Sequence, residues 1–169
     1  MLPIVLNPAA LKVGVVGAGD GLERRLQMLA DAGVKPVSVF KDIPGTDAVK
    51  FLHVLFVAGL DETSSRAVAN LARESGVLVN VEDRPALCDF HVPAAVRRGD
   101  LLFTVSTGGR SPALARLLRE QLDRQFGVHW EGRVNELARL RTAWRDEGAS
   151  PADVSERTRS LLAERGWLA

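Results

Sequence analysis

Short apolar runs alternate with amphipathic stretches along the first half of the chain. Four valine-rich runs predict strands at residues 12–16, 37–40, 52–58 and 77–81, and the last two are expected to be buried. Apolar residues at helical spacing from Leu22 to Gly33, and again over 62–75, predict helices between them. The stretch 41–50 is polar, contains proline and glycine, and predicts a loop. This alternation predicts an α/β fold with a Rossmann-like parallel sheet and right-handed crossovers.

The pattern changes after residue 90. The runs 90–96 and 101–106 predict two strands of a β-hairpin, with Arg97–Asp100 as its turn. Three helices are then expected, the first capped by Ser111 and Pro112, at residues 112–126, 130–147 and 151–165. We therefore expect a Rossmann-like domain over 1–83, a hairpin region over 84–112 and a helical C-terminal region over 113–169.

Composition excludes several classes of protein. With 169 residues, of which 46% are hydrophobic and 25% charged, the chain can form a hydrophobic core without disulfide bonds or bound metal ions. The single cysteine, Cys88, excludes an internal disulfide and any multi-cysteine metal site, and it fits a reducing compartment. No apolar stretch is long enough to span a bilayer, and the N-terminus lacks the basic region of a signal peptide. We expect a cytoplasmic protein without a membrane partner.

The net charge of +1 does not suggest nucleic-acid binding, but the distribution of charge is uneven. Between Arg97 and Arg145 there are ten arginines and five acidic residues. Most of these arginines are expected on solvated helix faces. The excess would nevertheless attract an anionic small molecule, because the guanidinium group pairs well with carboxylate and phosphate.

A glycine turn between the first strand and the first helix is the first candidate site. Gly17 permits a tight turn, and Gly19 allows a pyrophosphate to approach the helix N-terminus. The third position of the dinucleotide fingerprint is Leu22, where glycine or alanine is usual. The acid nearest the end of the second strand, which could bind a ribose, is Asp42.

Two further segments could carry chemistry. Glu82 and Asp83 follow the fourth strand, where a carboxylate could transfer protons or hold a metal, although a turn-capping role is equally compatible with the spacing. Residues 106–116 read Ser-Thr-Gly-Gly-Arg-Ser-Pro-Ala-Leu-Ala-Arg, and small polar residues before a helix can bind an anion. The alternative is a simple linker between hairpin and helix.

These residues resemble one known family. Asn80-Val81-Glu82-Asp83, Cys88-Asp89-Phe90 and the run 106–116 are similar to the precorrin-2 dehydrogenase family, the dehydrogenase/ferrochelatase part of sirohaem synthase. The glycine motif with the basic pair Arg24-Arg25 is also similar. The resemblance covers about residues 13–126.

The resemblance implies a fold, a reaction and a set of site residues. Family members are homodimers with an NAD domain, a central dimerisation region and a helical C-terminal part. They oxidise precorrin-2 to sirohydrochlorin with NAD, and some insert ferrous iron; a cobaltous ion is the other candidate metal substrate. Asp83 matches the catalytic aspartate. The cofactor residues would be Gly17, Ala18, Gly19, Asp20, Gly21, Leu22 and Gly59. The substrate residues would be Asn80, Thr107, Gly108, Gly109, Ser111 and Arg116. No metal-binding side-chain set is expected.

Three departures from the family pattern fall on the cofactor half. The stretch before Leu52 is shorter than usual, Ala58-Gly59-Leu60 stands where the family has Ala-Thr-Asp or Ala-Thr-Asn, and Leu22 replaces a small residue. Two alternatives therefore stand beside an NAD-dependent dehydrogenase. One is a chelatase that retains Asp83 without using NAD. The other is a non-catalytic tetrapyrrole-binding protein with a degenerate NAD site.

Overall fold

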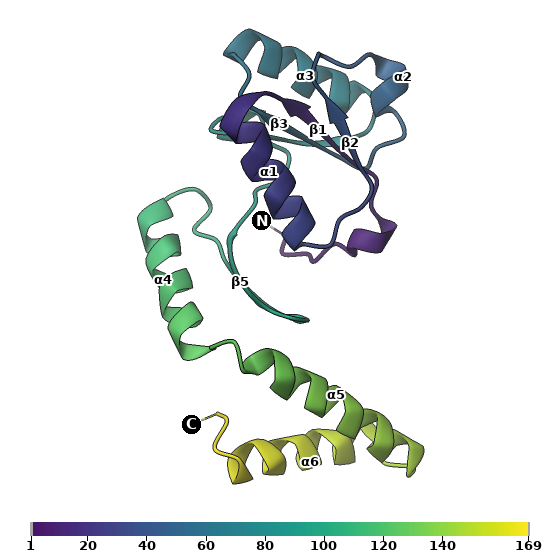
Figure 1. The fold of residues 1–169 in the computed structure, drawn as a ribbon, viewed down its shortest axis with the longest axis vertical. Helices are drawn as coiled ribbons and strands as arrows, with labels where there is room; N and C mark the ends of the chain where they lie inside the picture. Colours follow the sequence, from purple (N-terminus) through teal and green to yellow (C-terminus); the bar gives the residue numbers. More distant parts are fainter. Residues whose placement is uncertain (1, 169) are drawn as a thin grey trace. The chain divides into compact units, whose positions relative to one another are not determined.

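The structure is a computed structural model in which residues 2–168 are described. The chain divides into two compact units, Met1–Val92 (unit 1) and Pro93–Ala169 (unit 2). Figure 1 shows the course of the chain through both. Each unit is described by itself below.

Unit 1 is a parallel sheet with helices on both faces, as the alternating pattern predicts. Its strands are β1 (Val13–Gly17), β2 (Val37–Phe40), β3 (Val54–Ala58) and β4 (Leu78–Val81). Its helices are α1 (Gly19–Asp31), α2 (Thr46–Val49) and α3 (Glu62–Glu74), with 3-10 turns at Pro8–Ala10 and Pro85–Leu87. The strand order is β2-β1-β3-β4, and every pairing is parallel. The Rossmann-like fold class is confirmed.

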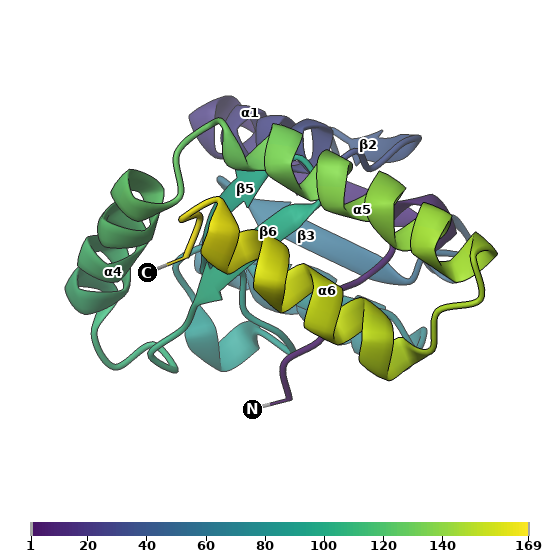
Figure 2. The same ribbon diagram turned by 90° about the horizontal axis from the view of Figure 1, so that it is seen from below.

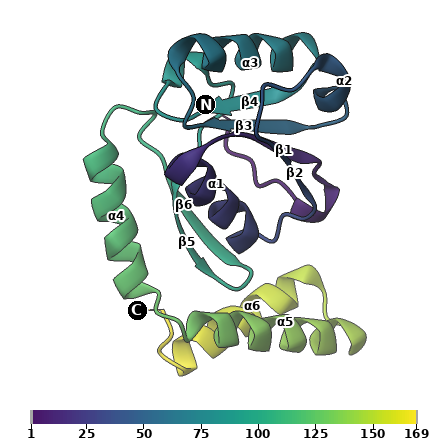
Figure 3. The same cartoon turned by 45° about the horizontal axis from the view of Figure 1, so that its top comes forward.

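Two apolar clusters form the core, one on each face of this sheet. Successive side chains of a strand point to opposite faces, so β3 contributes Leu55 and Val57 to one cluster and Val54 and Phe56 to the other. The first cluster packs against α3 and the second against α1, and Figure 3 shows these two helices on opposite sides of the sheet. Both β1 and β3 are buried along their whole length, which explains why their sequences are continuously apolar.

Two expectations for unit 1 are wrong in detail. The stretch 41–50 is not only a loop, since α2 forms one turn within it and Val49 is fully buried against the first cluster. Burial of this one apolar side chain stabilises a turn that the polar composition does not predict. The predicted buried strand 52–58 includes His53, but this side chain is exposed, and its Nδ1 accepts a hydrogen bond from the Lys12 amide at 3.0 Å.

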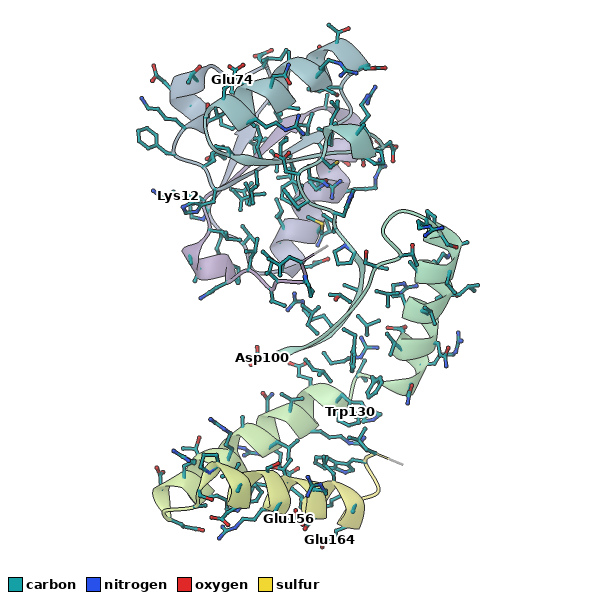
Figure 4. All side chains as sticks on the ribbon, turned by 180° about the vertical axis from the view of Figure 1, so that it is seen from behind. Lys12, Glu74, Asp100, Trp130, Glu156 and Glu164 are labelled. Atoms are coloured by element: carbon teal, nitrogen blue, oxygen red, sulfur yellow. The ribbon has the colours of Figure 1, made fainter. Side chains whose placement is uncertain are left out.

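Unit 2 contains a β-hairpin and three helices. These are β5 (Ala94–Arg98), β6 (Leu101–Val105), α4 (Pro112–Gln125), α5 (Trp130–Asp146) and α6 (Pro151–Glu164). Strands β5 and β6 are antiparallel and form a separate two-stranded sheet. Figure 2 shows α5 and α6 side by side, and Figure 4 shows Asp100 at the tip of the hairpin and Trp130 at the start of α5.

The hairpin differs from its prediction at both ends of the first strand. Residues 90–93 are not a strand, and β5 continues through Arg98, which pairs with Leu101. The turn is therefore only Gly99 and Asp100, and Gly99 has a φ of 58°. Phe90 lies in unit 1 instead, where its ring packs against Phe56 with a centroid distance of 5.5 Å.

Two of the three helices of unit 2, α4 and α6, begin with a capping side chain. The Ser111 hydroxyl accepts a hydrogen bond from the Leu114 amide at 3.4 Å, and Pro112 occupies the first turn. Ser150 and Asp153 form a capping box at the start of α6. Polar side chains thus satisfy amides that the helices leave unpaired.

Candidate functional site

The glycine turn after β1 is held against the end of β3 by two very close backbone approaches. A Cβ atom on Gly17, which has a φ of 156°, would lie 1.9 Å from the Ala58 carbonyl oxygen. A Cβ atom on Gly59 would lie 2.2 Å from the Ala18 carbonyl oxygen. The Ala18 amide also donates to the Ala58 oxygen at 3.3 Å. Both glycines are therefore required by the fold of this turn, and they place Ala18 at the start of α1.

The first turn of α1 is open to a ligand. Gly19 has a φ of 59°, and a Cβ atom built on it would have no atom within 4 Å. Ala18, the N-cap residue, makes no side-chain cap hydrogen bond, and Asp20 is exposed in the first turn. The N-terminal amides of a helix carry a partial positive charge and bind phosphate well. The cradle therefore fits the pyrophosphate of a dinucleotide.

The close packing of helix on strand occurs at Gly21, one residue before the position that the fingerprint assigns to it. A Cβ atom on Gly21 would lie 3.2 Å from the Gly59 amide nitrogen and 3.4 Å from the Ala58 Cβ atom. Leu22 is half-buried and packs against the core cluster on the α1 face. Leu22 is therefore compatible with the close approach of α1, because Gly21 provides it.

The end of β2 lies at Phe40, and Asp42 is exposed two residues later. Between β2 and β3 the chain has only the residues 41–53, including the single turn of α2.

Asp83 stands at the end of β4 in an unusual conformation. The Glu82 amide donates to the Val57 carbonyl oxygen at 2.9 Å, so pairing with β3 continues one residue beyond the strand. Asp83 follows with a φ of 56° and an exposed side chain. It is the one residue other than glycine with a positive φ in the described part of the chain. Such a conformation costs on the order of 1 kcal/mol and is common at functional sites.

A returning segment fixes the turn that contains Asp83. The Cys88 sulfur accepts a hydrogen bond from the Val81 amide at 3.2 Å and lies 3.4 Å from the Arg84 carbonyl oxygen. The thiol is therefore part of the turn and half-buried within it. The sequence carries no signal of this role, because it depends on contacts with Val81 and Arg84 in the folded turn.

Asp89 and Asn80 attach the same segment to β4. The Asp89 carboxylate accepts from the Val79 amide at 3.0 Å and from Arg73 Nε at 2.8 Å. Asn80 is 6% exposed, and its Nδ2 donates to the Phe90 carbonyl oxygen at 2.9 Å. The Asn80 amide group, a predicted substrate contact, thus holds the segment beside Asp83.

Charged side chains of α1 face this turn. Arg24 Nη2 lies 3.3 Å from Glu82 Oε1. Arg25 is half-buried with its guanidinium 5.1 Å from the Phe56 ring centroid, and Nη1 donates to the Met28 sulfur at 3.6 Å. Burial lowers the pKa of Arg25, and the negative charge of Glu82 partly opposes this effect.

The loop before α4 forms a second candidate site within unit 2. Gly108 and Gly109 have φ values of 64° and 78°, conformations that favour glycine. The Thr107 hydroxyl accepts from the Ser111 amide at 3.1 Å, which closes the loop. Both glycines are exposed, so their backbones are accessible to an anion. Arg116, on the first turns of α4, is also exposed and pairs with Glu120 at 2.9 Å.

No group of three or more histidine, cysteine, aspartate or glutamate side chains could hold a metal ion within residues 2–168. No helix in that range is long and apolar enough to cross a membrane.

Comparisons with protein families agree with the two-part organisation. A family model described as NAD(P)-binding matches residues 4–94, and a model described as the central part of a sirohaem biosynthesis protein matches residues 98–125. The chain is therefore an NAD(P)-binding protein with a Rossmann-like domain.

Its relatives identify the family. The siroheme synthase of Methylococcus capsulatus is 34% identical over 183 residues, which cover 96% of this chain and 35% of the relative. The siroheme synthase of Azotobacter vinelandii is 34% identical over 157 residues, covering 82% and 34%. The chain belongs to the precorrin-2 dehydrogenase/sirohydrochlorin ferrochelatase family, and the resemblance inferred from sequence is confirmed.

The match has two limits of extent. The chain spans about a third of the length of these relatives. The first alignment is longer than the 169 residues of this chain, so the relative contains residues without a counterpart here. Among solved structures, the precorrin-2 dehydrogenase SirC has a TM-score of 0.75 at 20% identity, covering 100% of this chain and 93% of SirC. The predicted fold, including the hairpin and the helical C-terminal part, is thus confirmed.

Proposed function

We propose that this protein oxidises precorrin-2 to sirohydrochlorin with NAD, as a step of sirohaem or cobalamin biosynthesis. The observation that carries the proposal is the placement of Asp83. Asp83 lies at the end of β4 with a backbone φ of 56° and an exposed carboxylate. The same unit contains the glycine cradle suited to a pyrophosphate. Ligands of open α/β sheets bind at the carboxyl ends of the strands.

The protein's own groups have separate tasks in this reaction. NAD, when bound, accepts the hydride that leaves the macrocycle. Gly17, Ala18 and Gly19 with the first turn of α1 hold the pyrophosphate. Asp83 accepts the proton that is lost with the hydride, so that precorrin-2 and NAD⁺ give sirohydrochlorin, NADH and a proton.

The loop before α4 is proposed to hold the carboxylates of the substrate. Its exposed glycine amides, the Ser111 hydroxyl and Arg116 match an anionic ligand, and the arginine-rich sequence of unit 2 adds a favourable field. Asn80 remains a predicted contact, although its Nδ2 is bonded to the Phe90 carbonyl oxygen.

NAD is proposed over NADP because Asp42 is the charged acid nearest the end of β2. A carboxylate there accepts hydrogen bonds from the ribose hydroxyls and repels a 2′-phosphate. Comparison of the dissociation constants of NAD and NADP, for wild type and Asp42→Asn, tests this choice. Loss of discrimination in the variant supports it, and a wild-type preference for NADP contradicts it.

Metal insertion is the second candidate activity. The connection between β2 and β3 belongs to the dinucleotide-binding unit, and its short length favours an activity that does not use NAD. Because residues 2–168 contain no cluster of metal ligands, chelation of ferrous or cobaltous ion would rest on Asp83 and the nitrogens of the substrate. Metal insertion without dehydrogenation would identify a chelatase. Tetrapyrrole binding that is unaffected by Asp83→Ala, without turnover, would identify a non-catalytic binding protein.

We further propose a homodimer in the cytoplasm. Within the described residues, β5 and β6 pair only with each other, and three leucines on α4 are exposed: Leu114, Leu117 and Leu118. A second copy would cover such edges and apolar side chains. The single half-buried thiol is compatible with a reducing compartment.

The deciding experiment is anaerobic conversion of precorrin-2, followed by absorbance with and without NAD. Asp83→Asn removes the carboxylate without changing side-chain size, and Asp100→Asn at the exposed hairpin turn is the matched control. We expect NAD-dependent sirohydrochlorin formation that Asp83→Asn reduces by about 10²- to 10⁴-fold and the control leaves unchanged. No NAD-dependent conversion by the wild type refutes the dehydrogenase proposal.

A further inference from the structure

The side chain of Glu82 lies beside the same helix turn that would bind the pyrophosphate. Its amide is fixed by the hydrogen bond to the Val57 oxygen at 2.9 Å, so the backbone position is set by the sheet. The carboxyl end of β4 is thus extended by an acidic residue that points toward α1. The side chain is only 20% exposed.

The two oxygens of this carboxylate face different partners. Oε1 lies 3.3 Å from Arg24 Nη2. Oε2 lies 2.5 Å from the point that a Cβ atom on Gly21 would occupy. Gly21 therefore leaves the space that Glu82 fills, and the carboxylate lies against the first turn of α1.

A negative charge at this position acts on dinucleotide binding. A pyrophosphate carries negative charge to the N-terminus of α1, and repulsion between two anions in a partly buried site is weakly screened. Arg24 is the compensating charge. Its side chain is 67% exposed, so the guanidinium remains beside Glu82 without itself being buried.

We propose that Glu82 and Arg24 together set the affinity for the dinucleotide: Glu82 opposes the pyrophosphate, and Arg24 masks the charge of Glu82. The inference rests on the dinucleotide site of the proposed function. It does not depend on which tetrapyrrole is oxidised, or on whether any is. Arg24 is a positioning and charge-masking residue in this account and makes no contact with the cofactor.

The test is a double-mutant cycle read by calorimetric titration with NAD⁺, and with ADP-ribose as a probe that lacks the nicotinamide. Arg24→Gln exposes the carboxylate and should weaken binding of both ligands by roughly three- to tenfold. Glu82→Gln should tighten binding by a similar factor. The double variant should bind about as tightly as Glu82→Gln, because Arg24 has then no charge to mask.

Glu23→Gln is the matched control. Glu23 is exposed on α1 next to Arg24, and the change replaces a glutamate with a neutral isostere, as Glu82→Gln does. It should leave both affinities unchanged. Raising the salt concentration should reduce the effect of Arg24→Gln.

Three results would overturn the inference. If Arg24→Gln weakens binding as much in the Glu82→Gln background, Arg24 contacts the phosphate directly. If Glu23→Gln tightens binding as Glu82→Gln does, the effect is general to the charge of α1. If Glu82→Gln and Arg24→Gln bind both ligands as tightly as the wild type, the pair does not set the affinity, while the dinucleotide site of the proposed function stands. The precorrin-2 conversion assay fails separately, because these titrations contain no tetrapyrrole.

Discussion

The two units differ in how much of their apolar surface they bury. In unit 1, strands β1 and β3 are buried along their whole length, and helices cover both faces of the sheet. In unit 2 only four apolar residues are buried in the described chain: Val96, Ala115, Trp130 and Ala149. Leu117 on α4 is 61% exposed. Unit 1 contains a complete core of its own, whereas unit 2 leaves the leucines of α4 exposed.

The candidate sites of the two units also differ in how closely their glycine residues are packed. The glycine turn of unit 1 is held by backbone atoms that leave no space for a methyl group at Gly17. The loop before α4 is closed by the bond from the Ser111 amide to the Thr107 hydroxyl, and Gly109 has open space around it. Substituting a glycine should therefore destabilise the fold more at the first site than at the second.

The largest effect is expected from Leu55→Ala in the core of unit 1. Leu55 is fully buried, so the change removes packed methyl groups and leaves a cavity. The free energy of unfolding should fall by about 3–4 kcal/mol, measured by urea denaturation. Leu118 on α4 is 39% exposed, so Leu118→Ala should change the free energy of unfolding by less than about 0.5 kcal/mol. Equal losses would contradict the contrast between the units.

Gly17→Ala should have the next largest effect. Its methyl group would meet the Ala58 carbonyl oxygen, which belongs to the sheet and cannot move aside. We expect a loss of about 2–3 kcal/mol in unfolding free energy together with loss of NAD binding. Gly109→Ala, where only a φ of 78° is unfavourable, should cost about 1 kcal/mol. A reversed order in thermal denaturation would refute this comparison.

Leu117→Ser tests whether a second copy covers α4. Since Leu117 is largely exposed, the variant should fold normally as judged by circular dichroism. The dissociation constant of the proposed dimer should increase by about tenfold, a loss of roughly 1.4 kcal/mol, measured by sedimentation equilibrium. Arg124→Ser, an exposed polar position on α4, is the control. An unchanged dimer in Leu117→Ser would place the interface elsewhere.

The smallest effect concerns the acid stability of unit 2. Arg98 donates to Asp123 at 2.8 Å and lowers the pKa of that carboxyl group from 3.8. Because the folded-state pKa is the lower one, the stabilisation is complete above the ordinary value. It is lost as the pH falls through the folded-state pKa.

Asp123→Asn should therefore lower the melting temperature slightly at pH 7 and not at low pH. Thermal scans over this pH range measure the difference. The Asp61 side chain, which accepts from the Ser64 amide at the start of α3, has a lowered pKa in unit 1. Asp61→Asn serves as the comparison, since asparagine also caps helices well. An equal loss at every pH would contradict an electrostatic origin.

Much of the fold was readable from local sequence. Short valine-rich runs predict β1 to β4 correctly. For β1 and β3 the signal is continuous because a strand buried on both faces needs no polar position. Ser111-Pro112 and Ser150-Pro151 mark the starts of α4 and α6, since capping depends on residues within one turn. The motifs at 80–90 and 106–116 were sufficient to identify the family.

Other features were decided only by contacts between distant residues. The turn of α2 exists because Val49 finds a place in the core, and residues 90–93 are not a strand because Phe90 packs on Phe56. The positive φ of Asp83 follows from the hydrogen bonds that fasten the segment 88–90 beside β4.

The packing of the Glu82 side chain against Gly21 shows most clearly what the sequence alone does not predict. Each residue could be read from the sequence as part of its own motif, the acid after a strand and the glycine in a turn. Their contact joins residues 61 positions apart, and it exists because parallel strands bring their carboxyl ends to one edge of the sheet. Local spacing in the sequence determined the helices, the strands and the residues with candidate chemistry. The tertiary structure alone decided that Arg24 and Glu82 face each other, because their distance depends on how the sheet is assembled.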